Sequence, residues 1–387
     1  MNMTTSPLEI AHGLAPLIRE QADAIDAARE LPRPLFETLA DAGLFQLALP
    51  RSLGGLEIAL PRYLEVLEAL GKADASTAWA INQGGLFAAF ASTRLPRACA
   101  EEIWAGKPRS VVSNTPIPAA KAVVTEGGYR VTGRMGFSTG CRHASWVAAY
   151  AQIFVGDQPR LDSEGRPELR YLMVPVAEAE ILDTWQVNGM RGTGTHHFQV
   201  KDVFVREERS FFRNAPPSES GPLYAILQTL LYGVGDAAVS LGMARTCLET
   251  FSELAGSKTP RSMQALLRDQ SMIQVNVGQC EAALRSGRAF LVEAVGNLWD
   301  EVTATGKTSL DRRAELRLAI THGVRLACQA VDIIYNAAGA TAVLKGNLIQ
   351  RHFQDMHVMT QHAQARMAYY EMVGRHWLGL PVPATEL

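Results

Sequence analysis

Two histidines near the end of the chain lie in QDMHVMTQHAQARMAYYE (residues 354–371), a stretch that is otherwise typical of one continuous helix. An imidazole can exchange protons near neutral pH, because its unperturbed pKa is about 6.5. At roughly 100° per residue, His357 and His362 are about 140° apart around a helix, so we do not expect them to share a metal. One of them can face a pocket as an acid or base. Structural histidines are the alternative that this stretch alone favours.

Hydroxyl groups are the second candidates for chemistry. GRMGFSTGCRHASW (133–146) contains Ser138 and Thr139, and WQVNGMRGTGTHHFQV (185–200) follows a tryptophan with a glycine-rich turn. Hydroxyls and backbone amides can form hydrogen bonds with a flat heterocycle, and glycines allow a backbone to approach a ligand closely. A strand end and a tight turn are the plain structural alternatives. His196 and His197 are adjacent in an expected strand, so they face opposite sides and do not form a joint metal site.

Other potential motifs point to structure. Gly233, Gly235 and Ala238 form a G-x-G-x-x-A string, but AILQTLLY precedes it and reads as helix, whereas a dinucleotide site requires a strand there. We therefore expect close helix packing at these small residues. The five cysteines are scattered without a CxxC pair. This distribution predicts reduced thiols, a cytoplasmic setting and no zinc site.

Three regions must position these groups. Residues 1–105 read as helices, beginning with a Ser-Pro start at Ser6. Residues 106–215 read as a small antiparallel β domain with a hairpin around Gly127–Gly128, and residues 216–387 as about four long amphipathic helices that form a bundle. The predicted fold class is therefore α+β.

Composition limits the partners. The 387 residues carry a formal charge of −2, which gives no electrostatic reason to expect a nucleic acid or a membrane. We find no signal peptide and expect no apolar run long enough to span a bilayer.

The motifs LFQLALPRSLGGLEI, DASTAWA, GGYRVTGRMGFSTGCRHASW, VNGMRGTGTHHFQVKDVFV, VSLGMARTCLE and NAAGATAV with LIQRHFQDMH occur in an order that resembles the acyl-CoA dehydrogenase superfamily over essentially the whole chain. The resemblance implies an N-terminal helical domain, a central β domain and a C-terminal four-helix bundle. It also implies a flavin between the β domain and the bundle, and a homotetramer.

The dehydrogenases of this superfamily use a glutamate as base, at positions that here hold Ala363 or Tyr232. Abstraction of an α-proton requires a positioned base. The chain therefore resembles the branch of two-component flavin-dependent monooxygenases (group D) more closely. That resemblance implies reduced FMN or FAD supplied by a separate NAD(P)H-dependent reductase, and O2 as co-substrate. A flavin C4a-hydroperoxide would then hydroxylate a small phenolic or indole-like substrate. Two alternatives remain, an acyl-CoA dehydrogenase or oxidase with a displaced base, and a member without flavin chemistry.

The resemblance also assigns residues. His362, beside the position of the missing glutamate, would move protons, while Thr139, with Ser138 beside it, would hold the flavin at N5. Further flavin contacts are implied for Ser113 and Asn114, and for Arg261 across a subunit boundary. Some relatives have a second active-site histidine where this chain has Phe87, so a two-histidine mechanism is not expected. The expected substrate pocket is lined by Trp79, Asn82, Phe87, Phe137, Trp185 and His357.

Overall fold

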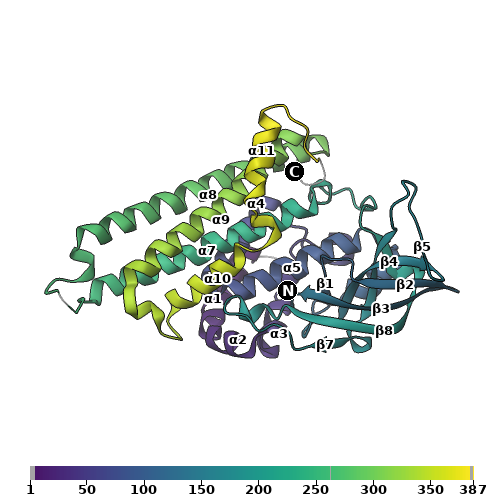
Figure 1. The fold of residues 1–387 in the computed structure, drawn as a ribbon, viewed down its shortest axis with the longest axis horizontal. Coiled ribbons are helices and arrows are strands. Elements are labelled where there is room, and N and C mark those ends of the chain that lie inside the picture. The colour runs from purple at the N-terminus through teal and green to yellow at the C-terminus, as the bar shows by residue number, and fades with distance from the viewer. Residues whose placement is uncertain (1–4, 262, 384–386) are drawn as a thin grey trace.

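The chain folds into an N-terminal group of helices, a central sheet and a C-terminal group of long helices, in that order (Figure 1). This computed structural model describes residues 5–261, 263–383 and 387. The predicted order of helices, strands and helices and the α+β class are confirmed.

The N-terminal helices begin where the sequence supplies capping groups. Ser6 starts the first helix with a capping box: its Oγ accepts from Glu9 N (3.2 Å), and the Glu9 carboxylate accepts from Ser6 N (2.7 Å). Asp74 caps the fifth helix by accepting from Thr77 N at 2.7 Å. This fifth helix is buried on nearly all sides, so it forms the centre of the molecule. The helices are α1 Pro7–Glu20, α2 Ala22–Ala28, α3 Arg33–Asp41, α4 Leu60–Ala73, α5 Ala75–Ser92 and α6 Arg97–Trp104.

The nine strands form one sheet with the order β7-β8-β3-β2-β4-β6-β9, and β1 and β5 both pair with β4. The predicted hairpin is confirmed, since Thr125 pairs with Gly128 across a turn in which Gly127 has a φ of 73°. The sheet is mixed rather than antiparallel, because β1 and β2 run parallel to β4. Strand β3 runs antiparallel to β2, and β4 lies on the other side of β2 and runs parallel to it. The strands are β1 Val112–Asn114, β2 Ala120–Thr125, β3 Gly128–Ser138, β4 Trp146–Val155, β5 Gln158–Pro159, β6 Leu169–Pro175, β7 Glu180–Leu182, β8 His196–Arg206 and β9 Ser210–Phe212.

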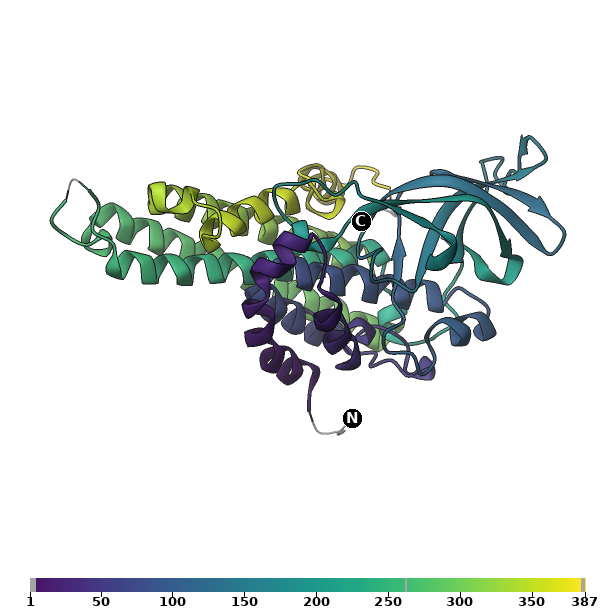
Figure 2. The same ribbon diagram turned by 90° about the horizontal axis from the view of Figure 1, so that it is seen from below.

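Three long helices, α7 (Gln228–Ser257), α8 (Ser271–Thr305) and α9 (Leu310–Ala338), lie side by side and extend away from the sheet (Figures 1 and 2). The fourth position of the bundle is taken by two shorter helices, α10 (Leu348–Met359) and α11 (Ala368–Trp377). The expectation of one continuous helix over residues 354–371 is therefore wrong.

The break after α10 is stabilised by arginines of α9. Arg325 donates to the backbone carbonyls of Thr360 (3.3 Å) and Ala365 (2.6 Å), and the buried Arg317 donates to the Gln364 side chain (2.7 Å). These bonds satisfy polar groups that leave the helical pattern. His362 adopts an extended backbone there, with φ −68° and ψ 147°.

The small residues of the G-x-G-x-x-A string were expected to allow close packing of helices. The G-x-G-x-x-A string lies inside α7, where a Cβ at Gly235 would overlap the side-chain amide of Asn82, so the expected close packing of helices is confirmed.

The stretch Leu310–Val343 is long and apolar enough, by length and composition, to cross a membrane. By that criterion the expectation of no such run is wrong. The central helix of a bundle meets the same criterion, and α9 packs against α7, α8 and α10.

Candidate active site

Trp79 of α5 lies where the three parts of the fold meet. Its indole Nε1 donates to Thr139 Oγ1, which follows β3, at 3.4 Å. Its ring packs edge-to-face against His362, which follows α10, with centroids 4.8 Å apart. Only 8% of Trp79 is exposed. The structure therefore brings together three predicted site residues that are far apart in the sequence.

His362 is held by a buried carboxylate. Its Nδ1 lies 2.8 Å from Oδ2 of Asp236, on α7, and 32% of the imidazole side chain is exposed compared with 2% for the carboxylate. Asp236 Oδ1 accepts from Asn82 Nδ2 at 3.0 Å, and Asn82 Oδ1 accepts from the Tyr63 hydroxyl at 2.9 Å. The carboxylate thus orients the ring and keeps the proton on Nδ1, which leaves Nε2 as the basic nitrogen.

The sheet side of the site is a row of hydroxyls. Thr139 Oγ1 lies 3.0 Å from Thr195 Oγ1, which lies 2.7 Å from Thr193 Oγ1, and Thr193 donates to the carbonyl of Met190 at 2.8 Å. Thr193 and Thr195 are buried, whereas Thr139 at the end of the row is partly exposed. The row therefore fixes the position of the one hydroxyl that faces outward.

The predicted Ser113, Asn114 and Ser138 support the turn beneath Thr139. Ser113 Oγ lies 2.8 Å from Ser138 Oγ and donates to the Thr139 carbonyl at 2.6 Å. Ser138 Oγ donates to the Asn114 carbonyl at 3.3 Å. Ser113 and Ser138 are 2% and 0% exposed, so in this structure they hold the backbone and do not reach the opening.

Aromatic rings flank the opening on the sheet side. Phe137 is 57% exposed, has an unusual positive φ of 57°, and lies edge-to-face with Trp185 at a centroid distance of 6.5 Å. Trp185 is fixed by its Nε1, which donates to the Met190 carbonyl at 3.1 Å. Its backbone N–H donates to Nδ1 of the fully buried His196 at 3.1 Å. Burial lowers the pKa of His196 to about 4, so this ring stays neutral and continues to accept. His197 is partly exposed, which confirms that the two adjacent histidines differ in environment.

Asp355 connects this loop to the C-terminal helices. It is 4% exposed, and its Oδ1 accepts from Met190 N at 2.5 Å. Burial raises the pKa of Asp355 to about 7, against the hydrogen bond from Met190, which lowers it. The nearby carboxylates of Asp74 and Asp26 also raise it, and Arg351 lowers it. Through this contact Met190, whose carbonyl accepts from Trp185 and Thr193, is attached to α10.

Three predicted residues lie elsewhere. Phe87 is fully buried and packs edge-to-face on Tyr171 at 5.4 Å, in the core between α5 and the sheet. His357 pairs with Asp332 of α9 at 2.9 Å, on a different face from His362, because the chain leaves the helix between the two histidines. Arg261 is exposed and belongs to the segment between α7 and α8. This segment lies at the end of the bundle away from the sheet (Figures 1 and 2).

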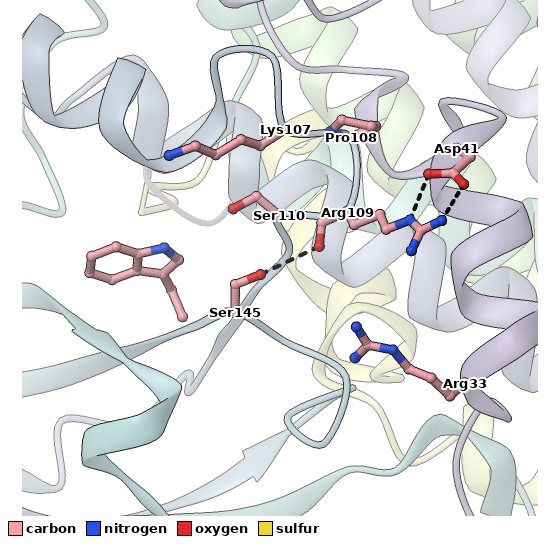
Figure 3. A pocket seen from close by; sticks show the side chains of 8 residues that line it. Arg33, Asp41, Lys107, Pro108, Arg109, Ser110 and Ser145 are labelled. Atoms are coloured by element: carbon pink, nitrogen blue, oxygen red, sulfur yellow. Dashed lines mark hydrogen bonds and ion pairs between the residues drawn. The ribbon is translucent and has the colours of Figure 1, made fainter.

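Two pockets also lie elsewhere. Figure 3 shows one of about 470 Å³ beside α3, lined by Arg33 and Lys107 and by Arg109, which bonds both carboxylate oxygens of Asp41 (2.8 and 2.7 Å). A second pocket of about 470 Å³ lies between residues 187–191 and the start of α10. Trp79, Thr139 and His362 line neither. The candidate site is thus described by its converging side chains, of which Trp79 is buried and His362 is partly exposed.

Asp236, Thr195 and Asp355 were not predicted from the sequence. A signal existed for Asp236, which is the only charged residue in AILQTLLYGVGDAAVSLGMA (225–244). A lone carboxylate in an apolar helix is costly unless it is paired, so its presence predicts a buried polar partner. Thr195 and Asp355 had no comparable signal, because their partners come from the fold of the loop.

Known proteins resemble this chain over nearly its whole length. The family models acyl-CoA dehydrogenase, N-terminal domain, and acyl-CoA dehydrogenase, C-terminal domain, match residues 14–94 and 234–367. An indole-3-acetate monooxygenase of Pseudomonas putida is 30% identical, with 94% of this chain and 92% of that protein covered. The flavin-dependent monooxygenase oxygenase subunit HsaA of Mycobacterium tuberculosis is 30% identical, with 97% and 96% covered. The crystal structure of an HsaA monooxygenase from M. tuberculosis has a TM-score of 0.87, 28% identity and 99% of each chain covered. The chain therefore belongs to the acyl-CoA dehydrogenase family, in the branch that contains flavin-dependent monooxygenases.

Proposed function

We propose that this protein is the oxygenase component of a two-component flavin-dependent monooxygenase. It uses reduced FMN or FAD from a separate NAD(P)H-dependent reductase, together with O2, to hydroxylate a small phenolic or indole-like compound. Similar proteins are named as an indole-3-acetate monooxygenase, and as an FADH2-dependent resorcinol hydroxylase oxygenase component that is 27% identical. The observation that carries the proposal is the imidazole of His362, oriented by Asp236, beside Trp79 and Thr139.

The residues at the opening fit a flavin ring. The partly exposed Thr139 hydroxyl and the Trp79 indole that donates to it are neutral and suit the amide-like edge of an uncharged heterocycle. Phe137 and Trp185 provide flat apolar surface beside them. Thr139 would hold the ring edge, and the aromatic pair would flank it. When bound, reduced flavin supplies the electrons that activate O2.

The protein's own groups then have defined tasks. His362 Nε2 takes a proton from the substrate hydroxyl or ring N–H, and Asp236 keeps the Nδ1 proton in place during this transfer. A general base of this kind contributes about 10²–10⁴-fold to the rate. Trp79, Phe137 and Trp185 keep water from the reacting atoms. Thr139 is held in one position by Thr195 and Trp79.

The dehydrogenase alternative requires a carboxylate that faces the substrate. The carboxylate that contacts His362, Asp236, is 2% exposed and lies behind the imidazole. It is bonded on both oxygens, to His362 and to Asn82. Such a group cannot reach an α-carbon while the imidazole stays in place, so the geometry favours oxygenation.

The test supplies the purified protein with reduced FMN or reduced FAD, isotopically labelled O2 and a panel of phenols and indoles. We expect one labelled oxygen atom in a hydroxylated product, and less H2O2 than in the absence of substrate. Dye reduction by an acyl-CoA without any reductase, with no labelled product, would instead establish the dehydrogenase reaction. Failure to bind either flavin would support the member without flavin chemistry.

The proposal includes three further features. A homotetramer would cover the open side of the site, where Phe137 is exposed, and could bring Arg261 of one copy to the flavin phosphates of another. Size measurement in solution tests the assembly, and anaerobic titration with each reduced flavin separates FMN from FAD. A cytoplasmic location agrees with five cysteines that are free thiols, and cell fractionation tests it.

A further inference from the structure

The described part of the chain contains one group of side chains with metal-ligating atoms close together, and it lies outside the candidate active site. Cys328 and Asp332 are one turn apart on α9, and His357 comes from the facing side of α10. Their ligand atoms all lie within 4.8 Å of one another. Cys328 Sγ is 3.8 Å from Asp332 Oδ2, and His357 Nε2 is 2.9 Å from Asp332 Oδ1.

We propose that Cys328, Asp332 and His357 bind a divalent transition-metal cation of the zinc class, although the spacing of the cysteines in the sequence predicted no zinc site. A tetrahedral zinc with bonds of about 2.0–2.3 Å places its ligand atoms roughly 3–4 Å apart, so this group needs to adjust by less than about 1 Å. Sulfur, nitrogen and oxygen ligands together select zinc or cobalt over magnesium and calcium, which take oxygen ligands. The side chains of Asp332 and His357 are 41% and 44% exposed, which leaves room for water as the fourth ligand.

The surroundings prepare the site for a cation. The His357 ring packs edge-to-face on Phe353 at 4.5 Å, and Phe353 stacks on Tyr335 at 4.0 Å, so the imidazole is fixed with Nε2 toward Asp332. His357 also lies in the last turn of α10, where the helix dipole attracts positive charge.

Two features of the surroundings bear on cation binding: the positive charge of Arg325 and the proton on the Cys328 thiol. The positive charge of Arg325 acts on the Cys328 thiol, but its guanidinium donates to the carbonyls of Thr360 and Ala365 and is therefore directed at the chain break. Burial and the charge of Asp332 raise the pKa of the Cys328 thiol to about 11, so the cation must displace the thiol proton when it binds.

A bound cation would join α9 to the end of α10, directly before the segment Thr360–Met367 that carries His362. Binding to the folded state alone stabilises that state. We therefore expect metal to raise the melting temperature of the full-length protein, without any requirement for flavin or substrate.

The experiment treats the full-length protein with a chelator, removes the chelator, and titrates with Co2+. A cobalt–thiolate bond gives a charge-transfer absorption in the near ultraviolet. We expect one Co2+ per chain with this absorption, displacement of the cobalt by Zn2+, and a rise in melting temperature. Cys328→Ser and Cys328→Ala should abolish the absorption, and Asp332→Asn should weaken binding at least tenfold.

The matched control is His376→Gln. His376 pairs with Asp311 at 2.7 Å, as His357 does with Asp332, but outside the three-residue group. This control should bind cobalt as the wild type does. Circular dichroism confirms that each variant is folded. No thiolate absorption in the wild type at saturating Co2+, or an absorption that survives in both cysteine variants, would overturn the proposal.

Discussion

Replacement of Asp236 by Asn should disable the imidazole while changing hardly any volume. The carboxylate is 2% exposed and bonds His362 at 2.8 Å and Asn82 at 3.0 Å. Because Asn82 donates its N–H, the new amide must present its oxygen to Asn82 and its NH2 to His362. Nδ1 then becomes an acceptor and the proton moves to Nε2, so the nitrogen that should take the substrate proton is already protonated.

The size of the effect follows from what is lost. A hydrogen bond to a charged group contributes about 1.5–3 kcal/mol to stability. Loss of general base catalysis costs about 10²–10⁴-fold in rate. We therefore expect Asp236→Asn to lower the rate of product formation at least ~100-fold. The reduced flavin that is consumed should then appear as H2O2.

The assay measures hydroxylated product and H2O2 per reduced flavin, with thermal unfolding to confirm a folded protein. The control is Asp311→Asn, which removes the carboxylate partner of His376 outside the site and should leave both yields unchanged. A variant Asp236→Asn with the product yield and rate of the wild type would refute the assignment of the Nε2 atom as base.

Three further outcomes are expected. His362→Ala should lose oxygenation at least ~100-fold and release H2O2, and normal turnover in this variant would remove the imidazole from the mechanism. Gly235→Ala should displace Asn82 and lower both melting temperature and product yield, because a Cβ there overlaps the Asn82 amide. The same change at the exposed Gly278 of α8 meets nothing within 4 Å and should stabilise by about 0.5–1 kcal/mol; equal effects at both glycines would contradict the packing argument. Burial raises the pKa of Asp355 to about 7, so the folded state holds this proton more tightly than the unfolded state, and ionisation destabilises the fold increasingly from about pH 4 to about pH 7. Asp355→Asn keeps an acceptor oxygen for Met190 and removes that cost. It should therefore raise the free energy of unfolding at about pH 8 by an amount on the order of a few kcal/mol, measured by denaturant unfolding, and this gain should shrink toward about pH 4. A gain independent of pH would show that the carboxylate is not the cause.

The sequence was sufficient to place the main parts of the site. Thr139 and Trp185 belong to motifs next to strands, and Trp79 belongs to a capped helix, and the family resemblance named all three as site residues together with His362. The structure places Trp79 in contact with both Thr139 and His362, whereas Trp185 packs against Phe137. The order of the three regions followed from the change between helical and strand periodicity.

What could not be predicted depends on distant partners. Asp236 and His362 are 126 positions apart, so no local spacing relates them. His357 and His362 face different partners, as expected, but the expected reason, their angle around one helix, was wrong. The helix ends between them, and Arg325 of α9 satisfies the carbonyls of a break that local propensity does not reveal. The mixed sheet was missed because strand direction depends on where β4 inserts, and alternation of polar and apolar residues is the same for parallel and antiparallel neighbours.

The loop of residues 187–194 is attached on several sides, and this limits how molecules can reach the site. A Cβ at Gly189 would overlap the backbone of Gln354 in α10, and Met190 is bonded to Asp355 of the same helix. The sheet therefore cannot rotate away from the helices without breaking these contacts. In the single chain, the exposed Phe137 marks the side of the site that can be reached while these contacts stay intact.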